Sequence, residues 1–197
     1  MEAIKKINIM IHIIFDLEST CWEQDGDFQR GNGEIIEIGA VKYRDNSKID
    51  EFTQFIRPVK FPELSEFCKK LTSISQDDVD TAPLFKDAMS NFENWIFDKV
   101  THGESIKFWS WGFYDKDQII KECLLNEYSG KISKLMVENH RNMKFAFGDA
   151  TGIRKGRGME RALEYLQIPL VGTHHRGIDD ARNIGKIFER IYTTLSL

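Results

Sequence analysis

The chain has 197 residues, 41% of them hydrophobic and 29% charged, and its formal net charge is −4. This length predicts a single domain, and the interspersed charges exclude a disordered or membrane-spanning chain. The acidic balance argues against a protein that coats nucleic acid through bulk positive charge, because such binding relies on clustered Lys and Arg. A site in which carboxylates hold metal ions remains open, since bound cations reverse the local charge.

The longest apolar stretch, residues 7–15, includes Asn8 and His12 and is far shorter than the roughly 20 residues that a membrane helix needs. It lacks a small-residue cleavage site, so no secretory signal is expected and the chain is expected in the cytoplasm. The cysteines are odd in number and widely spaced, which fits reduced thiols better than disulfides or a zinc site. They are Cys21, Cys68 and Cys123.

Three strands are predicted in the first part of the chain, at residues 9–15, 34–43 and 51–57. Residues 9–15 form a continuous apolar run, which is typical of a strand buried on both faces in the middle of a sheet. Residues 44–50 are polar and rich in turn formers, so an antiparallel connection is expected between the second and third strands. The chain is therefore expected to open as a meander.

The pattern then alternates between helix and strand. Residues 58–83 predict short helical pieces, and they precede helices at 84–96 and 115–126 that flank a strand at 106–111. Further helices are expected at 159–166 and 178–192. This order resembles, in pattern only, a ribonuclease-H-like α/β fold with a mixed sheet flanked by helices.

A glycine-rich segment, residues 148–158, is expected to be a mobile basic loop. Its cations are candidate phosphate contacts, although a solvated loop explains them equally well. They are Arg154, Lys155 and Arg157.

Asp16 and Glu18 follow the first apolar strand and, because side chains alternate in a strand, they share one face. Two adjacent carboxylates repel each other unless protons or cations offset the charge, and hard oxygen ligands of this kind suit Mg²⁺ or Mn²⁺. The alternative is a strand that simply ends at the surface.

A second acidic segment, Asp179 and Asp180, opens the last predicted helix. The apolar stripe of that helix places Asp180 toward the sheet and Asp179 on the solvated side with Asn183. Asp180 could cap the helix start or meet a cation. His174 and His175 precede the helix, and either could accept a proton from water or be a plain surface histidine.

The segment SWGFYD joins an aromatic strand end to a helix with Asp115 at its expected N-cap. Capping alone would explain Asp115, and the helical stripe does not separate it from Asp117. The nearby rings of Trp22, Trp111 and Phe113 could stack on nucleobases or belong to the core.

In order, FDLEST, EIIEIGAV, SWGFYD and HHRGIDDARN resemble the exonuclease motifs of the DEDDh family, which is DnaQ-like with a ribonuclease-H-like fold. The segment LSEFCKKLTSISQDDVDTAPLF is similar to the connector of its ERI-like branch, except that Ser73 stands where the family has glycine. The resemblance covers about residues 9–192 and treats 1–197 as a single exonuclease domain. It implies a five-stranded mixed sheet, an antiparallel meander followed by parallel strands.

The resemblance also implies a metal-dependent 3′-to-5′ exonuclease that releases 5′-mononucleotides from RNA or single-stranded ends, using two Mg²⁺ or Mn²⁺ ions. It assigns the metal ligands and the general base, favouring Asp115 over Asp117 and His175 over His174. The implied ligands are Asp16, Glu18, Asp115 and Asp180, and the implied base is His175.

The terminal nucleoside is expected to contact the residues that follow the first catalytic strand and the second motif. These are Leu17, Ser19, Thr20, Trp22 and Trp111. Three alternatives remain open: a DNA repair or proofreading exonuclease, a ribonuclease H endonuclease, and a non-catalytic nucleic-acid-binding regulatory module on the same fold. The sequence leaves the oligomeric state undetermined.

Overall fold

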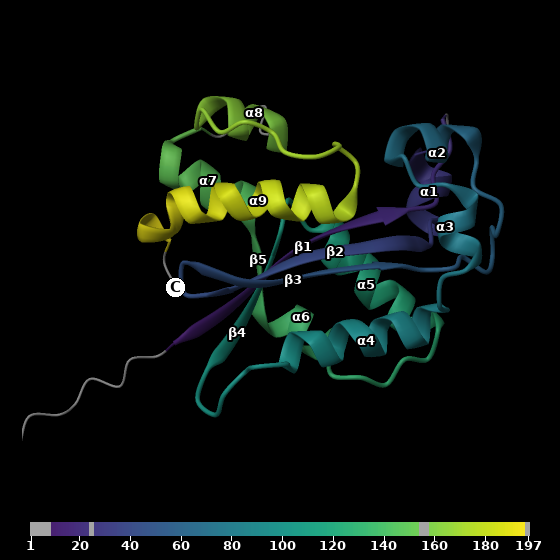
Figure 1. Cartoon of the computed structure of the whole chain (residues 1–197), viewed down its shortest axis with the longest axis horizontal. Helices are drawn as coiled ribbons and strands as arrows, with labels where there is room; N and C mark the ends of the chain where they lie inside the picture. The colour runs from purple at the N-terminus through teal and green to yellow at the C-terminus, as the bar shows by residue number, and fades with distance from the viewer. Residues whose placement is uncertain (1–8, 24–25, 154–157, 196–197) are drawn as a thin grey trace, which may run out of the picture.

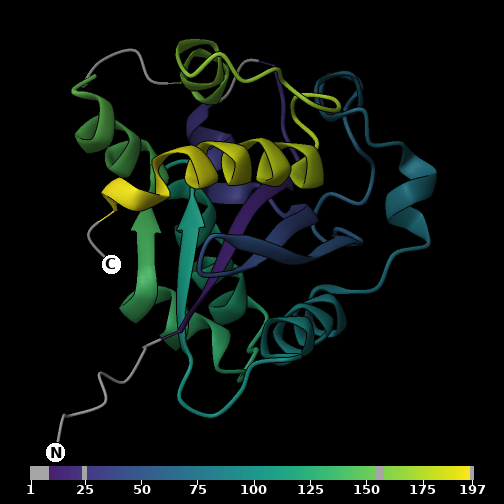
Figure 2. The ribbon, with the colours of Figure 1, turned by 60° about the vertical axis from the view of Figure 1, so that its left-hand side comes forward.

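The computed structural model describes residues 9–23, 26–153 and 158–195. Its strands form a five-stranded mixed sheet in the order β3-β2-β1-β4-β5 (Figures 1 and 2). β1 is central, pairing antiparallel with β2 and parallel with β4, so the predicted sheet is confirmed. The strands are β1 Met10–Ser19, β2 Ile35–Arg44, β3 Ser47–Phe55, β4 Ser105–Ser110 and β5 His140–Asn142.

Two helical layers cover the sheet (Figure 1). α4, α5 and α6 pack on one face, whereas α7, α8 and α9 pack on the other, and α1 to α3 lie together at one end. The helices are α1 Gly26–Asn32, α2 Glu66–Thr72, α3 Gln76–Asp80, α4 Phe85–Phe97, α5 Tyr114–Leu125, α6 Ile132–Asn139, α7 Met143–Thr151, α8 Met159–Tyr165 and α9 Gly177–Ile191, followed by the 3-10 turn η1 Tyr192–Thr194.

The apolar run of β1 is buried on both faces, as its composition predicts. Ile11, Ile13 and Phe15 pack against α4, α5 and α6, whereas Ile14 packs against α7, α8 and α9. All four side chains have zero exposure. β1 is thereby held between both layers, and the residues at its carboxyl end are fixed in position.

α9 approaches the sheet at Gly39 of β2. A Cβ at this position would lie 2.0 Å from the carbonyl carbon of Gly177 and 2.1 Å from the nitrogen of Ile178, so only glycine fits. Gly39 is the strand partner of Asp16. The absence of a side chain at Gly39 therefore brings the first turn of α9 close to Asp16.

Several boundaries differ from the sequence predictions. β1 continues through Ser19, and β3 begins at Ser47 because Asp45 adopts a left-handed φ of 51° in a tight turn. Helices α1, α6 and α7 and the short strand β5 were not predicted from local pattern. The expected loop at residue 148 is wrong, because α7 extends to Thr151. Residues 154–157, with the candidate phosphate contacts, lie outside the described residues.

Ser73 stands where the family that the motifs resemble has glycine. It ends α2 with a left-handed φ of 58°, a conformation that glycine adopts without steric cost.

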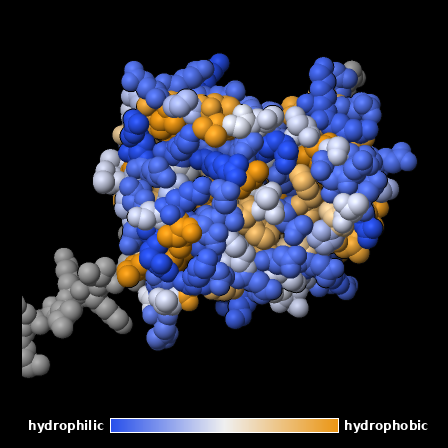
Figure 3. Space-filling model, viewed as in Figure 1, coloured by the Kyte–Doolittle hydropathy of each residue, from blue (hydrophilic) through white to orange (hydrophobic). Residues whose placement is uncertain are grey.

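The molecular surface on the side seen in Figure 3 is mostly polar, with apolar residues showing in separate patches. Within the described residues, no helix combines the length and the apolar character needed to cross a membrane.

Candidate active site

A pocket of about 280 Å³ lies where the carboxyl ends of β1 and β4 meet the amino-terminal end of α9. It brings together side chains from four segments that are far apart in sequence. The lining residues are Asp16, Leu17, Glu18, Trp111, Tyr114, Asp115, Met159, His174, His175 and Asp180. The pocket thus contains the four acidic residues that the family resemblance implies as metal ligands, together with both histidines.

Asp16 and Glu18 both line the pocket, as the strand periodicity predicts. Oxygen atoms of Asp16, Glu18 and Asp180 lie within 4.8 Å of one another. The strand does not end at the surface here, since β1 continues to Ser19 and Glu18 is 8% exposed. The pair is therefore a cluster of like charges inside the pocket, with Glu18 buried and Asp16 partly buried, rather than a solvated strand end.

Asp115 does not cap α5, contrary to the sequence prediction. The helix has Phe113 at its N-cap position, and Asp115 lies in the first turn. Its carboxyl interacts with its own backbone N–H, the Ser110 hydroxyl and the Leu17 backbone. Burial raises the pKa of Asp115 to about 6, although these hydrogen bonds oppose the rise. Capping therefore does not account for this buried carboxyl.

Asp180 faces the sheet, in agreement with the position of the apolar stripe on α9. It is 5% exposed, and it accepts a hydrogen bond from the His175 backbone nitrogen at 3.1 Å. Asp179 instead accepts from the Thr173 nitrogen and from Arg182, each at 2.9 Å. The two neighbouring aspartates thus have different surroundings, because only Asp180 lines the pocket.

Asn183 was expected on the solvated side of α9 but is fully buried. Its side-chain amide bonds the Val171 nitrogen and carbonyl oxygen, each at 2.9 Å. The segment before the site covers this helix face, which helical periodicity alone does not reveal. These bonds fasten that segment to α9.

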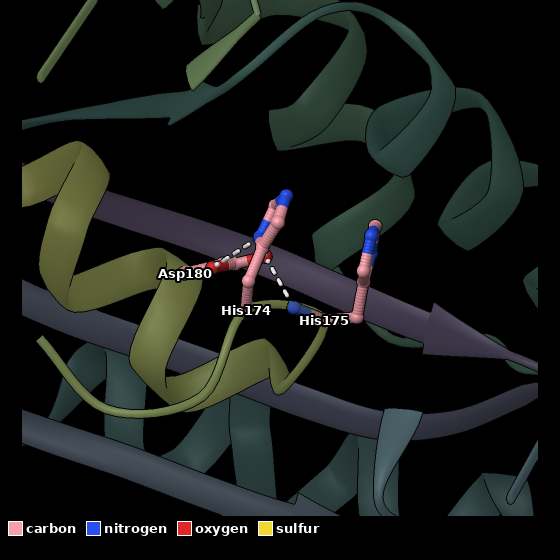
Figure 4. A group of neighbouring side chains, drawn as sticks. All are labelled: His174, His175 and Asp180. Carbon is pink, nitrogen blue, oxygen red and sulfur yellow. Dashed lines mark hydrogen bonds and ion pairs between the residues drawn. The ribbon is translucent and has the colours of Figure 1, made fainter. Parts of the chain in front are cut away.

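The two histidines stand side by side above Asp180 (Figure 4). Their rings are stacked with centroids 4.0 Å apart, and His175 has a left-handed φ of 64°. His174 Nδ1 lies 2.9 Å from Asp180 Oδ2. Burial lowers the pKa of His175, and the neighbouring His174 lowers it further. A neutral His175 ring is therefore available to accept a proton near neutral pH.

The electrostatics of the pocket suit a divalent cation. Burial raises the pKa of Asp16 and of Glu18, and the neighbouring carboxylates raise both further. Without cations, this repulsion favours protonation of part of the cluster. Carboxylate oxygens are hard ligands that Mg²⁺ and Mn²⁺ prefer, so the donor set fits such ions.

An ion pair that sequence reasoning missed fixes the turn that carries the histidines. Arg176 Nε lies 3.1 Å from Glu37 Oε2, and the Gly177 backbone nitrogen donates to the same oxygen at 3.0 Å. Glu37 has zero exposure and pairs with Glu18 across β1 and β2. The second glutamate of EIIEIGAV, which stands between isoleucines, was the available signal.

The expected nucleoside contacts divide into two groups. Leu17 and Trp111 line the pocket. Ser19 and Thr20 are buried beside it, and the Thr20 hydroxyl accepts a hydrogen bond from the Glu34 nitrogen at 3.0 Å. Trp22 packs edge to face with two phenylalanine rings, Phe28 and Phe61.

Two further pocket residues were not identified from the sequence. Tyr114 is adjacent to Asp115 in the quoted SWGFYD motif, which was a usable signal. Met159 comes from α8, and only the packing of that helix brings it to the site.

Comparison with known proteins agrees with this geometry. The Exonuclease family (RNase_T) matches residues 13–188. The "Probable 3'-5' exonuclease KapD" of Bacillus subtilis is 31% identical, over 91% of this chain and 83% of the relative. "ERI1 exoribonuclease 2" of Xenopus laevis is also 31% identical, over 91% of this chain, but the match spans only 28% of that longer protein.

A solved structure adds agreement in three dimensions. The nuclease domain of 3'hExo, a DEDDh family member bound to rAMP, superposes with a TM-score of 0.84 and 26% identity, covering 94% of this chain and 93% of that domain. E. coli exonuclease I with a dA16 oligonucleotide, at 10% identity and a TM-score of 0.68, shares the fold. The chain therefore belongs to the Exonuclease family, among the 3′-to-5′ exonucleases of the DEDDh type.

Proposed function

We propose that this chain removes 5′-mononucleotides from the 3′ end of RNA. The observation that carries the proposal is the convergence of the four acidic residues and His175 in one pocket, from segments that the chain itself separates widely. The proposed metal ligands are Asp16, Glu18, Asp115 and Asp180. Such a convergence is costly to the fold unless cations and substrate use it.

DEDDh exonucleases use divalent metal ions, and the hard oxygen donors of this pocket favour Mg²⁺ or Mn²⁺. When bound, such ions supply a more acidic water and neutralise charge on the reacting phosphate. The carboxylates of this chain would hold and orient the bound ions. Asp115 is held by Ser110 and Leu17, and Asp180 by the His175 backbone.

His175 would accept the proton of the attacking water at a ring nitrogen. Its lowered pKa keeps the ring neutral, as a base must be. The Arg176 to Glu37 ion pair fastens the adjacent turn to β2, so the ring stays beside the carboxylates. The water oxygen would bond to the terminal phosphorus while the bond from phosphorus to the 3′ oxygen of the shortened strand breaks. That 3′ oxygen would take up a proton from solvent, and His175 would return its own proton to solvent as the 5′-mononucleotide departs.

Leu17 and Trp111 are the proposed contacts of the terminal nucleoside, because both line the pocket beside the carboxylates. Ser19, Thr20 and Trp22 are proposed to shape the neighbouring wall. RNA is favoured as substrate by the relatives, since the Xenopus protein is named an exoribonuclease and the 3'hExo domain is bound to rAMP.

The first experiment compares 5′-labelled single-stranded RNA, single-stranded DNA and a stem-loop RNA, each with Mg²⁺ or Mn²⁺. Preferential shortening of RNA from its 3′ end supports the proposal. Equal or faster degradation of DNA would favour the rival, a DNA repair exonuclease. Cleavage of a hairpin without a free 3′ end would indicate an endonuclease instead.

A matched pair of variants separates catalysis from nucleic-acid binding alone. Asp115→Asn should abolish shortening of the RNA, whereas Asp117→Asn should not, because Asp117 has an exposed side chain paired with Lys116. A purified wild-type chain that binds RNA but does not shorten it under any metal would support the non-catalytic alternative.

A further inference from the structure

A buried pair of polar residues lies directly behind Asp115. His140 begins β5, Ser110 ends β4, and the two strands run parallel beside each other (Figure 2). Ser110 Oγ is 2.9 Å from His140 Nε2. Ser110 has zero exposure and His140 is 9% exposed, so water hardly competes with this contact.

The Ser110 hydroxyl has more possible acceptors than protons. It lies 3.2 Å from the Gly112 carbonyl oxygen and 2.9 Å from His140 Nε2. A hydroxyl donates one hydrogen bond and accepts others. If His140 Nε2 carries the imidazole proton, the ring donates to Oγ, and the hydroxyl proton is directed toward the Gly112 carbonyl oxygen.

The surroundings of His140 favour a neutral ring in a fixed orientation. Phe15 and Phe113 contact the ring, with centroids 6.2 Å and 5.9 Å away. Burial, together with the nearby Lys116, lowers the pKa of His140 to about 4. The neutral imidazole has one N–H, and a proton on Nε2 lets the ring donate to the Ser110 hydroxyl.

We propose that His140 is a positioning residue, which donates through Nε2 to Ser110 and thereby directs the Ser110 hydroxyl to the Gly112 carbonyl oxygen, fixing the turn that leads into Asp115. This inference rests on the proposed function, in which Asp115 is a metal ligand. A fixed turn keeps the Asp115 carboxylate in one position, as outer partners of metal ligands commonly do. The chain of contacts links β5, β4 and α5.

The informative substitution is His140→Phe, which keeps an aromatic ring between Phe15 and Phe113 but removes Nε2. We expect the Mn²⁺ concentration for half-saturation to rise about tenfold, the scale on which outer-shell changes weaken metal binding. Ser110→Ala should have the same effect. The double variant should lose no more than either single variant, because both break one path.

Rescue by a conservative variant distinguishes positioning from packing. His140→Gln places an amide N–H near the former Nε2, so its Mn²⁺ affinity should stay within about twofold of wild type. His12→Phe serves as the matched control, since His12 is also a buried histidine of the sheet with aromatic neighbours. It should change thermal stability without changing Mn²⁺ affinity.

The measurement is Mn²⁺ binding to the full chain, followed by the electron paramagnetic resonance signal of free Mn²⁺, alongside RNA degradation. Unchanged affinity in both His140→Phe and Ser110→Ala would overturn the inference, as would equal weakening by His140→Gln and His140→Phe. Asp115→Asn distinguishes a failure of the proposed function from a failure of the positioning role of His140. If it leaves Mn²⁺ binding and RNA degradation intact, the proposed function of Asp115 fails, independently of His140.

Discussion

Arg176 forms a two-point ion pair with Glu37, a fully buried residue of β2. Arg176 Nε lies 3.1 Å from Oε2 and Nη2 lies 3.3 Å from Oε1. The arginine also lies over the Phe55 ring, 5.2 Å from its centroid. Because Arg176 directly follows His175, this contact determines where the proposed base sits relative to the sheet.

Glu37→Gln tests this anchor. The amide keeps its size but loses the charge, so Arg176 and the Gly177 nitrogen lose their strong acceptor. We expect the free energy of unfolding to fall by about 1–3 kcal/mol, toward the lower value because Arg176 is 25% exposed. The RNA degradation rate should fall several-fold, since the turn carrying His175 loosens. Urea unfolding and single-turnover kinetics measure the two effects.

Glu51→Gln is the matched control for that prediction. Glu51 also joins the sheet to α9 by pairing with Arg182, but both side chains are well exposed. Exposed pairs contribute about 0–1 kcal/mol, so little change in stability or rate is expected. A larger loss for Glu51→Gln than for Glu37→Gln would contradict the anchoring role of Glu37.

Divalent cations should stabilise the folded chain, because they offset repulsion among the buried carboxylates. At a Mn²⁺ concentration about 100 times the dissociation constant, one bound ion adds about 2.7 kcal/mol. A chelator should reverse the rise in Tm. Asp16→Asn should abolish both this rise and RNA degradation. In chelator its own Tm should match or exceed that of wild type, since one charge of the cluster is gone.

His175→Ala should lower the single-turnover rate about 10²- to 10⁴-fold while Mn²⁺ binding persists, because the variant lacks only the proposed proton acceptor. His174→Ala is the paired test. His174 contacts Asp180 through Nδ1, so its loss should have a smaller effect, within about tenfold of wild type. A greater loss of rate in His174→Ala than in His175→Ala would exchange the roles assigned to the two rings.

His12 should make the fold sensitive to acid. Burial lowers its pKa from 6.5 to about 4, and Trp109 Nε1 donates to its Nδ1 at 3.0 Å. The unfolded chain therefore takes up the proton first as pH falls. The stabilising contribution is complete above pH 6.5 and is lost as pH falls toward 4. Between pH 7 and pH 5 this loss amounts to about 2 kcal/mol.

His12→Asn provides the comparison, because its side-chain oxygen can still accept from Trp109. The variant should lose less unfolding free energy than wild type between pH 7 and pH 5, by about 2 kcal/mol. His140, whose pKa is also lowered, is present in both proteins and cancels in the difference. Identical pH dependence in the two proteins would show that His12 does not titrate in this way.

Much of the architecture follows from local pattern. The burial of β1 on both faces was predictable from its unbroken apolar run. The apolar stripe on α9 correctly predicted that Asp180 faces the sheet and that Asp179 faces away. Patterns of this kind report which face of an element is buried. They do not report what covers it, which is why the burial of Asn183 was missed.

The short elements escaped prediction for a related reason. β5 has three residues, His140–Asn142, too few for a strand period to show. α7 runs through Gly148, which reads locally as a loop residue but is buried against the sheet in the structure. Tertiary packing overrides local propensity in such segments.

The sequence by itself determined the pairing of Asp16 with Glu18, the orientation of Asp180, and the family to which the motif order belongs. Only the tertiary structure decided that Asp115 sits inside the pocket rather than at a helix cap. It also decided that Glu37 pairs with Arg176 beside the histidines and that Ser110 lies beside Asp115. The physical reason is range. Periodicity describes residues within one helix or strand. These contacts join residues that are far apart in the chain and come together only when the chain folds.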